Sequence, residues 1–406
     1  MTTTPDQADR LDLDDEVTPA ASELPAAEAD TANLTAAAEH ASTHATSSRR
    51  SAREVAESLL AWAEQHHMLD PLTVTSHGAQ AAAPEDGTLF PAQGDTLYTL
   101  RNKQVAGVLF NEPEHCVYVL TRKRIGVRAL KNMPSWQGGN AIKYLYYGQA
   151  SAGDNRQPAD QASYRLIHDR YTCGSSVHPA RFPGAGTLGC LVRDAAGQMY
   201  GLSANHVSGL SNYAEGGEKI LAPGHMDITP AGCDPFTIGV HHRGLPMVHG
   251  SPANVNISQN SDAAVFLIRD PERVSSSQGG YYDTPSAVSI PVGGMQVEKV
   301  GRTTGYTTGR IIGESPAPQP IGYQVAAVGG NATVYFNNVM MVFGENGAPF
   351  SQAGDSGSLV VSRNEAGEPC AVGLVVAGTS SGYSLILPIA PILEALQMTL
   401  VSGHYP

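Results

Sequence analysis

The chain has 406 residues, a net charge of −13 and a hydrophobic fraction of 41%. This composition is typical of a globular protein, and because no apolar stretch of about 18 residues is present to span a bilayer, we expect no membrane partner. A nucleic-acid partner is also excluded, because the sequence offers no basic patch for a phosphate backbone.

Residues 1–50 are rich in Ala, Thr, Ser and acidic residues. They hold ten acids against three arginines, which accounts for about half of the net charge of −13. Such a segment cannot bury enough apolar surface to offset the entropy of ordering it, so we predict a disordered acidic tail. Its first residues lack the basic start and apolar core of a secretory signal, and export by that route is not expected.

The cysteines also favour a protein that is not exported. Cys116, Cys173, Cys190, Cys233 and Cys370 are odd in number, and no two of them form a C-x-x-C pair. Small secreted domains instead use even numbers of cysteines to build disulfide frameworks. We therefore expect a cytoplasmic protein.

Residues 51–161 are predicted to form a small α+β domain. Ser51 and Glu54 have the spacing of a capping box, and apolar residues then recur at helical spacing, which predicts a helix over about 52–67. Strands are predicted at 96–110, 116–124 and 142–147, where β-branched and aromatic residues are frequent.

From Tyr171 onward, many short β-rich runs are separated by glycine and proline. This pattern is typical of antiparallel barrels or sandwiches, so the fold class is predicted to be mainly β. One helix is expected near the end, over about 390–399, with Pro391 in its first turn.

The segment Gly354–Ser358 places Ser356 in a glycine-lined turn. A serine hydroxyl attacks an amide only when a base accepts its proton, and His206 in the segment Leu202–Val207 is the candidate base. Asp262, at the start of an apolar run, can fix the imidazole tautomer and stabilise the imidazolium. The backbone N–H groups of Gly354 and Ser356 are candidate donors to the developing oxyanion.

The order His206, Asp262, Ser356 separates this chain from the α/β-hydrolases, in which the acid and the histidine follow the serine. Long intervals separate the three residues. Such spacing suits a base and an acid on one barrel and a nucleophile on a second.

These three motifs resemble those of the trypsin-like (chymotrypsin-fold) serine peptidases. The likeness extends through Ala185–Gly189, Lys299–Gly305 and Val372–Ser380, and covers roughly residues 168–400. The combination is most similar to an intracellular bacterial branch that resembles the plant narrow-leaf protein. Asn205 and Ser358 depart from the family pattern, and neither change removes a catalytic atom.

The resemblance implies a protease domain over 168–400 made of two six-stranded antiparallel β-barrels. The first barrel is expected at about 172–270 and the second at about 285–388, with the site in the cleft between them. A small α+β domain and a disordered tail precede them.

Asp355 is expected to point inward, where an unpaired carboxylate is costly, so it needs a cation. In some bacterial relatives an arginine just before a G-R-T-T-G-like segment supplies it. The resemblance therefore implies Lys299 as the partner, with Arg302 as second choice. On this hypothesis no N-terminal cleavage is required.

The resemblance also implies that Val376, Ala377 and Gly378 wall the substrate pocket, with Phe350 near its base. No acid is expected at the pocket floor, which disfavours Arg and Lys and favours a small or medium apolar side chain. The backbone of Val376–Gly378 can pair with an extended substrate as an added strand.

His225, Cys233, His241, His242 and His249 form a loose cluster whose spacing matches no metal motif. We therefore predict no metal and no cofactor.

Two functions remain open. The first is a serine endopeptidase that hydrolyses polypeptides through an acyl-enzyme on Ser356. The second is a binding or scaffold protein that keeps the fold with a silent or latent site, because a fold alone does not guarantee turnover. The sequence does not predict the oligomeric state.

Overall fold

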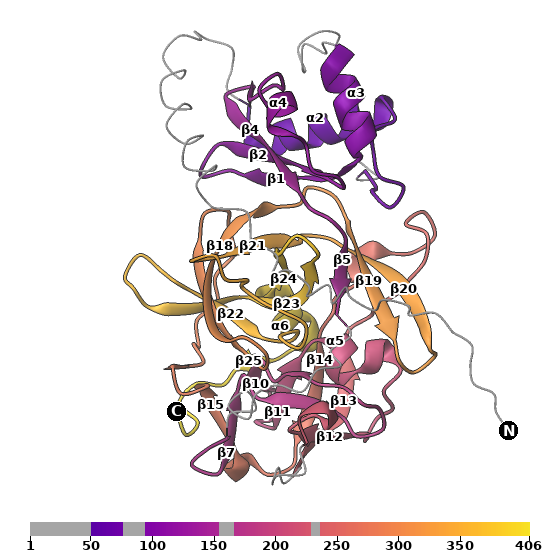
Figure 1. Ribbon diagram of the computed structural model, residues 1–406. Helices are drawn as coiled ribbons and strands as arrows, with labels where there is room; N and C mark the ends of the chain where they lie inside the picture. The colour runs from indigo at the N-terminus through magenta and orange to yellow at the C-terminus, as the bar shows by residue number, and fades with distance from the viewer. Residues whose placement is uncertain (1–49, 76–93, 154–165, 229–235) are drawn as a thin grey trace, which may run out of the picture. The chain divides into compact units, whose positions relative to one another are not determined.

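Antiparallel strands dominate the part of the chain that the computed structural model describes, residues 50–75, 94–153, 166–228 and 236–406 (Figure 1). They form a 13-stranded, an 8-stranded and a 4-stranded sheet. The predicted mainly β class is therefore confirmed. The tail predicted for residues 1–50 lies outside the described residues, apart from Arg50.

The first helix, α2 (Ala52–Gln65), begins where the sequence predicts. The Ser51 side chain accepts a hydrogen bond from the backbone N of Glu54 at 3.1 Å, and the Glu54 carboxylate accepts one from the backbone N of Ser51 at 3.0 Å. This reciprocal pair satisfies two N–H groups that a helix start leaves without partners, and it confirms the capping box.

The strand predicted over 96–110 is wrong in its first half, because α3 (Gly94–Lys103) is a helix. Thr96 and Leu100, one turn apart, are its buried residues. Asp95 lies in its first turn and two basic residues in its last, charges that complement the helix dipole. The other elements of this N-terminal module are β1 (Val105–Asn111), β2 (Cys116–Thr121), α4 (Val127–Leu130), β3 (Trp136–Gln137) and β4 (Asn140–Tyr146).

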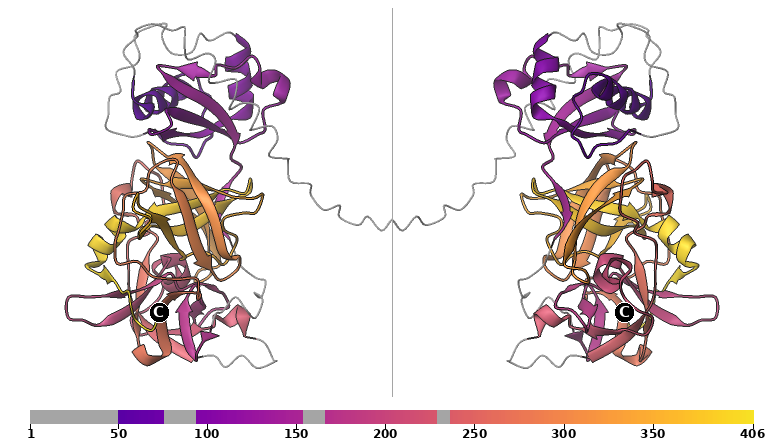
Figure 2. Two further views of the ribbon diagram at one scale, coloured as in Figure 1. Left: turned by 90° about the vertical axis from the view of Figure 1, so that its left-hand side faces the viewer. Right: turned by 90° about the vertical axis from the view of Figure 1, so that its right-hand side faces the viewer.

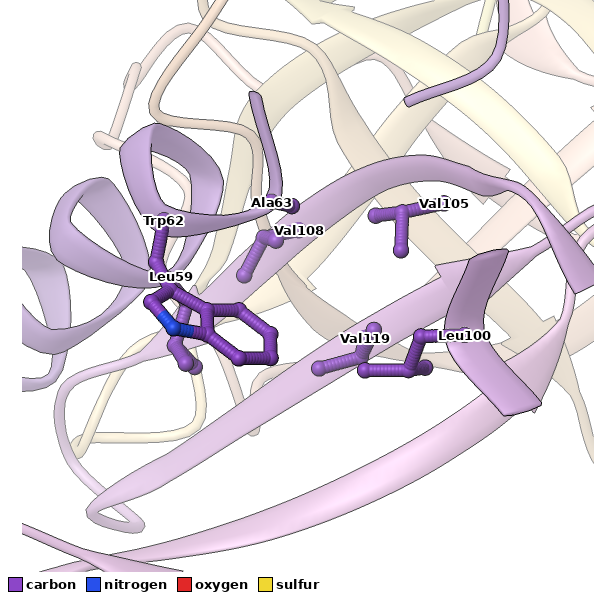
Figure 3. A pocket seen from close by; sticks show the side chains of 7 residues that line it. All are labelled: Leu59, Trp62, Ala63, Leu100, Val105, Val108 and Val119. Atoms are coloured by element: carbon purple, nitrogen blue, oxygen red, sulfur yellow. The ribbon is translucent and has the colours of Figure 1, made fainter. Parts of the chain in front are cut away.

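A cavity of about 10 Å³ lies between the helices and the sheet of this module (Figure 3). All seven side chains that line it are apolar: Leu59, Trp62, Ala63, Leu100, Val105, Val108 and Val119. A single water needs about 10–15 Å³ and polar partners. The cavity is therefore part of the core rather than a ligand site.

Six antiparallel strands close into a barrel through the pairings β17–β18–β21–β24–β23–β22–β17. Their bounds are β17 (Gln296–Gly301), β18 (Gly305–Glu314), β21 (Met340–Gly344), β22 (Leu359–Arg363), β23 (Pro369–Thr379) and β24 (Ser384–Pro388). This closed barrel occupies the range expected for the second barrel.

The range expected for the first barrel holds an open sheet, in the order β25-β10-β11-β14-β13-β12-β8-β9. Within the residues that the structure describes, no pairing joins β9 to β10, so this sheet is a half-barrel and the expected closure is wrong. Part of the outer edge of β10 is occupied by β25, through Arg193↔Thr399 and Val192↔Leu400. The strands are β8 (Ser176–Pro179), β9 (Gly186–Thr187), β10 (Cys190–Arg193), β11 (Met199–Ser203), β12 (Lys219–Ala222), β13 (Phe236–Gly244), β14 (Ala264–Ile268) and β25 (Thr399–Leu400).

The C-terminal helix α6 (Ile389–Leu396) is shorter than the predicted 390–399, and Pro391 lies in its first turn. It ends because Gln397 adopts a left-handed conformation, with φ 54°, and the chain turns into β25. The helix packs against β23, on the outside of the closed barrel in Figure 2. None of the helices in the described ranges is long and apolar enough to cross a membrane.

The remaining strands are β5 (Ala150–Ala152), β6 (Leu166–Ile167), β7 (Arg170–Cys173), β15 (Val274–Gln278), β16 (Tyr282–Asp283), β19 (Gln319–Val325) and β20 (Gly330–Phe336). The short helices are α5 (Asn205–Ser208) and the 3₁₀ turns η3 (Leu210–Asn212), η4 (His225–Asp227), η5 (Ile257–Gln259) and η6 (Pro271–Arg273). Of these, β5, β19, α5 and η4 contribute to the site described next.

Candidate active site

His206 and Asp262 are brought together by neighbouring strands. His206 lies in α5 just after β11, Asp262 lies just before β14, and β11 pairs with β14 through Ser203↔Ala264. Asp262 Oδ1 accepts a hydrogen bond from the backbone N of His206 at 2.9 Å, and Oδ2 lies 2.6 Å from His206 Nδ1. The carboxylate is fully buried, whereas 13% of the imidazole is exposed. With Nδ1 held by the carboxylate, Nε2 is the ring nitrogen left for proton transfer.

Tyr323, on β19, completes this pair and was missed from the sequence. Its hydroxyl donates a hydrogen bond to Asp262 Oδ2 at 3.0 Å, and its ring centroid lies 5.4 Å from that of His206. Burial raises the pKa of Tyr323 well above its ordinary value, and the negative charge of Asp262 raises it further. The hydroxyl therefore stays protonated and remains a donor. No motif marks this tyrosine, because only the tertiary fold places it beside Asp262.

The serine turn packs against β9 and the end of β11. Thr187 donates its backbone N–H to Ser356 O at 2.9 Å and its hydroxyl to Gly354 O at 2.8 Å. A Cβ on Gly357 would lie 2.4 Å from Ser203 Oγ and 2.9 Å from Ala204 N, so only glycine allows this approach. The turn thus lies next to the residues that lead into His206.

The hydroxyl of Ser356 makes no hydrogen bond to any residue that the structure describes, His206 included. The Ser356 residue is 7% exposed. In enzymes without substrate, the contact between nucleophile and base is often long and tightens in the complex.

The backbone of the turn presents two free donors. Asp355 N–H donates to Gln352 O at 2.9 Å and Gly357 N–H to Val375 O at 2.8 Å. By contrast, among the described residues neither Gly354 N–H nor Ser356 N–H has an acceptor. Gly354 has φ 98°, a conformation that favours glycine. The N–H groups of Gly354 and Ser356, two residues apart in the turn, are therefore available to an anionic oxygen.

Asp355 is fully buried and accepts five hydrogen bonds. Its Oδ1 accepts from the backbone N of Thr303 at 2.7 Å and of Thr304 at 3.1 Å. Its Oδ2 accepts from Thr304 Oγ1 at 2.6 Å, the backbone N of Gln352 at 3.0 Å and Lys299 Nζ at 3.3 Å. Lys299 is also fully buried. The buried carboxylate is therefore neutralised by one ammonium and held by four further donors.

Arg302 forms an ion pair with a different carboxylate. Its Nε lies 2.8 Å from Asp227 Oδ2, and its Nη2 contacts Asp227 Oδ1, with both side chains 1% exposed. Asp227 follows β12 of the half-barrel, whereas Arg302 follows β17 of the closed barrel. This bidentate ion pair therefore links the half-barrel to the closed barrel.

The residues expected to form the substrate pocket lie in two settings. Val376 and Ala377 are buried on β23, and Gly378 pairs on that strand with Ser151 of β5. Phe350 is fully buried in the core of the closed barrel, where its ring centroid lies 5.9 Å from Lys299 Nζ.

No group of three or more His, Cys, Asp or Glu within the described ranges is arranged to hold a metal ion. Cys233, from the loose cluster noted in the sequence, lies outside those ranges. The four described cysteines are free and buried, and burial raises the pKa of Cys173 to about 12.

Comparison with known proteins gives partial matches. Residues 283–396 match the model of the Nal1 C-terminal domain, a range that includes the serine turn but neither His206 nor Asp262. The chain is 24% identical over 266 residues to Protein NARROW LEAF 1 of Oryza sativa subsp. japonica. That match covers 61% of this chain and 43% of the relative, so the chain spans less than half of the relative's length.

Among solved structures, Thermobifida fusca protease A is 18% identical, with a TM-score of 0.36, over 59% of this chain and 99% of that one. The Nocardiopsis protease is 21% identical, with a TM-score of 0.36, over 55% of this chain and 95% of that one.

Proposed function

We propose that the protein is a serine endopeptidase that hydrolyses peptide bonds through an acyl-enzyme on Ser356. The observation that carries this proposal is the contact of a buried Asp262 carboxylate with His206 Nδ1 at 2.6 Å. Such an arrangement fixes the tautomer of a base and stabilises it when it becomes charged, which a serine nucleophile requires.

In the proposed reaction, His206 Nε2 takes the proton of Ser356 Oγ as the oxygen attacks the substrate carbonyl. The free N–H groups of Gly354 and Ser356 stabilise the oxyanion. His206 then gives the proton to the leaving amine, and water hydrolyses the acyl ester by the same steps in reverse.

The buried pair of Lys299 and Asp355 supports a turn that is assembled without a new N-terminus. In this proposal Lys299 neutralises Asp355, and Arg302 instead links the barrels through Asp227. No cleavage of the chain is then needed to order the oxyanion site.

The substrate in this proposal is an extended polypeptide that pairs with β23 near Val376, Ala377 and Gly378. In this proposal, residues 51–161 form a domain that controls access to the site formed by residues 168–400. The enzyme belongs to an intracellular bacterial branch of the family. It acts in the cytoplasm. The free, buried cysteines support that location.

The second candidate is a protein that keeps this fold with a silent or latent site. It is favoured by the missing hydrogen bond between Ser356 Oγ and His206 among the described residues.

A fluorophosphonate probe separates the two functions. The full chain is expected to be labelled at Ser356, and His206→Ala and Ser356→Ala are each expected to abolish labelling, while Ser251→Ala, an exposed serine, keeps it. With a peptide substrate, Ser356→Ala is expected to lower kcat by about 10⁶-fold, because the three residues act as a unit. Absence of labelling in both the full chain and an N-terminally trimmed chain would favour the silent scaffold.

A further inference from the structure

The strand β5 (Ala150–Ala152) lies between β23 and β19 (Figure 1). It pairs antiparallel with β23 through Thr379↔Ala150 and Gly378↔Ser151. On its other side it pairs parallel with β19 through Gly322↔Ser151 and Tyr323↔Ala152. A segment that precedes both barrels in the sequence is therefore inserted beside β23, the second strand after the serine turn.

The register of β5 leads towards that turn. Continued by two residues, the antiparallel pairing sets Ala152 opposite Ala377 and Gly153 opposite Val376. A Cβ on Gly153 would lie 2.8 Å from Ala353 Cβ, and Ala353 directly precedes Gly354. The carboxyl end of the segment thus reaches the residues that present the two free N–H groups.

The side chains of the segment alternate as those of a bound strand do. Ala150 is 4% exposed and Ala152 is 8% exposed, whereas Ser151 is exposed. Ala152 pairs with Tyr323, whose hydroxyl contacts Asp262. The second residue from the carboxyl end of the segment therefore lies beside the network that orients His206.

Further contacts hold the segment at its amino end. Gln149 N–H donates to Ser380 Oγ at 3.2 Å, Ser380 N–H donates to Gln149 O at 3.1 Å, and the Ser381 hydroxyl donates to Tyr147 O at 2.5 Å. Gly148 has φ 66°, a conformation that favours glycine, and a Cβ there would also lie 2.2 Å from Ser380 Oγ.

We propose that Ala150–Gly153 is a built-in ligand that fills the substrate-binding half of the cleft on the amino side of the scissile bond and keeps the site latent. This inference rests on the proposed endopeptidase function. An extended peptide recognised by strand addition needs the edge of β23, and β5 already occupies it. Because the ligand belongs to the same chain, its effective concentration is high, and substrates gain access only when it is displaced.

The same segment defines the substrate class. Gly153, Ala152 and Ala150 occupy the first, second and fourth positions before the bond to be cut. Each of these positions holds a small side chain or none, and the close approach of Gly153 to Ala353 leaves no room for a Cβ without a shift. The preferred substrates are therefore extended polypeptides with small residues at these three positions.

Displacing the segment tests its inhibitory role. Ala152→Glu puts a carboxylate into a buried position opposite Tyr323, which expels the segment, whereas Ser151→Glu adds the same charge at its exposed neighbour. Fluorophosphonate labelling of Ser356 is expected to be at least about 10-fold faster in Ala152→Glu than in the wild type. A loss of about 1.4 kcal/mol from the free energy that holds the segment in place corresponds to a tenfold change. Ser151→Glu is expected to label at the wild-type rate.

Ser151→Pro is a second variant, because proline removes an N–H group and is not tolerated between two strands. Thermal unfolding shows whether each variant keeps its fold. If a folded Ala152→Glu or a folded Ser151→Pro variant is labelled at the wild-type rate, the inference is overturned.

A binding measurement does not depend on turnover. A fluorescent peptide of residues 147–153 is expected to bind the double variant Ala152→Glu/Ser356→Ala saturably, and to bind Ser356→Ala alone at least about 10-fold more weakly. A scrambled peptide is expected not to bind. Labelling without peptide binding overturns the built-in ligand and leaves the proposed function standing. Peptide binding without any labelling supports the ligand and overturns the function.

Discussion

The Tyr323 hydroxyl donates a hydrogen bond to Asp262 Oδ2 at 3.0 Å, and the same oxygen contacts His206 Nδ1 at 2.6 Å. Tyr323 comes from the large sheet that contains the closed barrel, whereas His206 and Asp262 come from the half-barrel. The carboxylate is therefore fixed from both sheets. This arrangement makes the tyrosine a positioning residue in the proposed mechanism.

Tyr323→Phe keeps the ring beside His206 and removes only the hydroxyl. A hydrogen bond to a charged group contributes about 1.5–3 kcal/mol, so kcat is expected to fall about 10–100-fold with little change in KM. Steady-state kinetics on a peptide substrate measure both constants.

Tyr335→Phe on β20, the partner strand of β19, is the matched control, and we expect it to keep the wild-type kcat. An unchanged kcat in a folded Tyr323→Phe enzyme would show that Asp262 does not need this donor.

Lys299→Met removes the only ammonium that contacts Asp355 among the described residues. Breaking one side of a buried ion pair costs about 3–5 kcal/mol, because the other charge stays buried. The free energy of unfolding, measured with urea, is expected to fall by that amount, and probe labelling is expected to fall with it.

Adding Asp355→Asn to Lys299→Met removes the remaining charge and is expected to restore part of the stability. Our assignment of Lys299 would be wrong if Lys299→Ala changed neither stability nor activity while an N-terminal cut proved essential.

The pair of Arg302 and Asp227 is expected to stabilise the contact between the barrels. Both side chains are buried, so Arg302→Met is expected to lower the free energy of unfolding by about 3–5 kcal/mol.

Arg310→Met is the matched control, because Arg310 contacts Glu114 with 49% and 30% of the two side chains exposed. Exposed pairs contribute about 0–1 kcal/mol. Equal effects of the two arginine variants in urea unfolding would contradict a special role for the buried pair.

Local signals predicted some elements well. The Ser51 capping box predicted the start of α2, and the short β-rich runs separated by glycine and proline indicated the mainly β fold. The helix α3 was missed because its strand-like apolar residues outweighed the weaker signal of Asp95 in its first turn. Helix capping is a contact between near neighbours, so sequence alone can reveal it.

Other features depend on contacts that sequence distance hides. Nothing in the sequence near Ala150 indicates that this segment pairs with β23. Nothing near Tyr323 indicates that its hydroxyl contacts Asp262. In the half-barrel, β25 pairs with part of β10, a contact between residues about 200 positions apart. Such pairings follow from the whole fold and not from a local pattern.

His178 provides a test of stability against pH. Its pKa is lowered from 6.5 to about 4, chiefly by burial and to a smaller extent by the charges of His206 and His225. The Nδ1 contacts with Pro179 O at 3.1 Å and Phe182 O at 3.2 Å oppose this shift. Between these pKa values the unfolded chain binds a proton that the folded chain excludes. The folded state therefore loses stability as pH falls from 6.5 towards 4, by up to about 3 kcal/mol.

His178→Gln keeps a side-chain donor for the two carbonyls and cannot bind this proton. The slope of the unfolding free energy against pH between 4 and 6.5 is expected to fall by about 1.4 kcal/mol per pH unit, the value for one proton. Urea unfolding at a series of pH values measures the slope. Identical slopes in the wild type and the variant would mean that the folded protein accepts a proton at His178 as readily as the unfolded chain does.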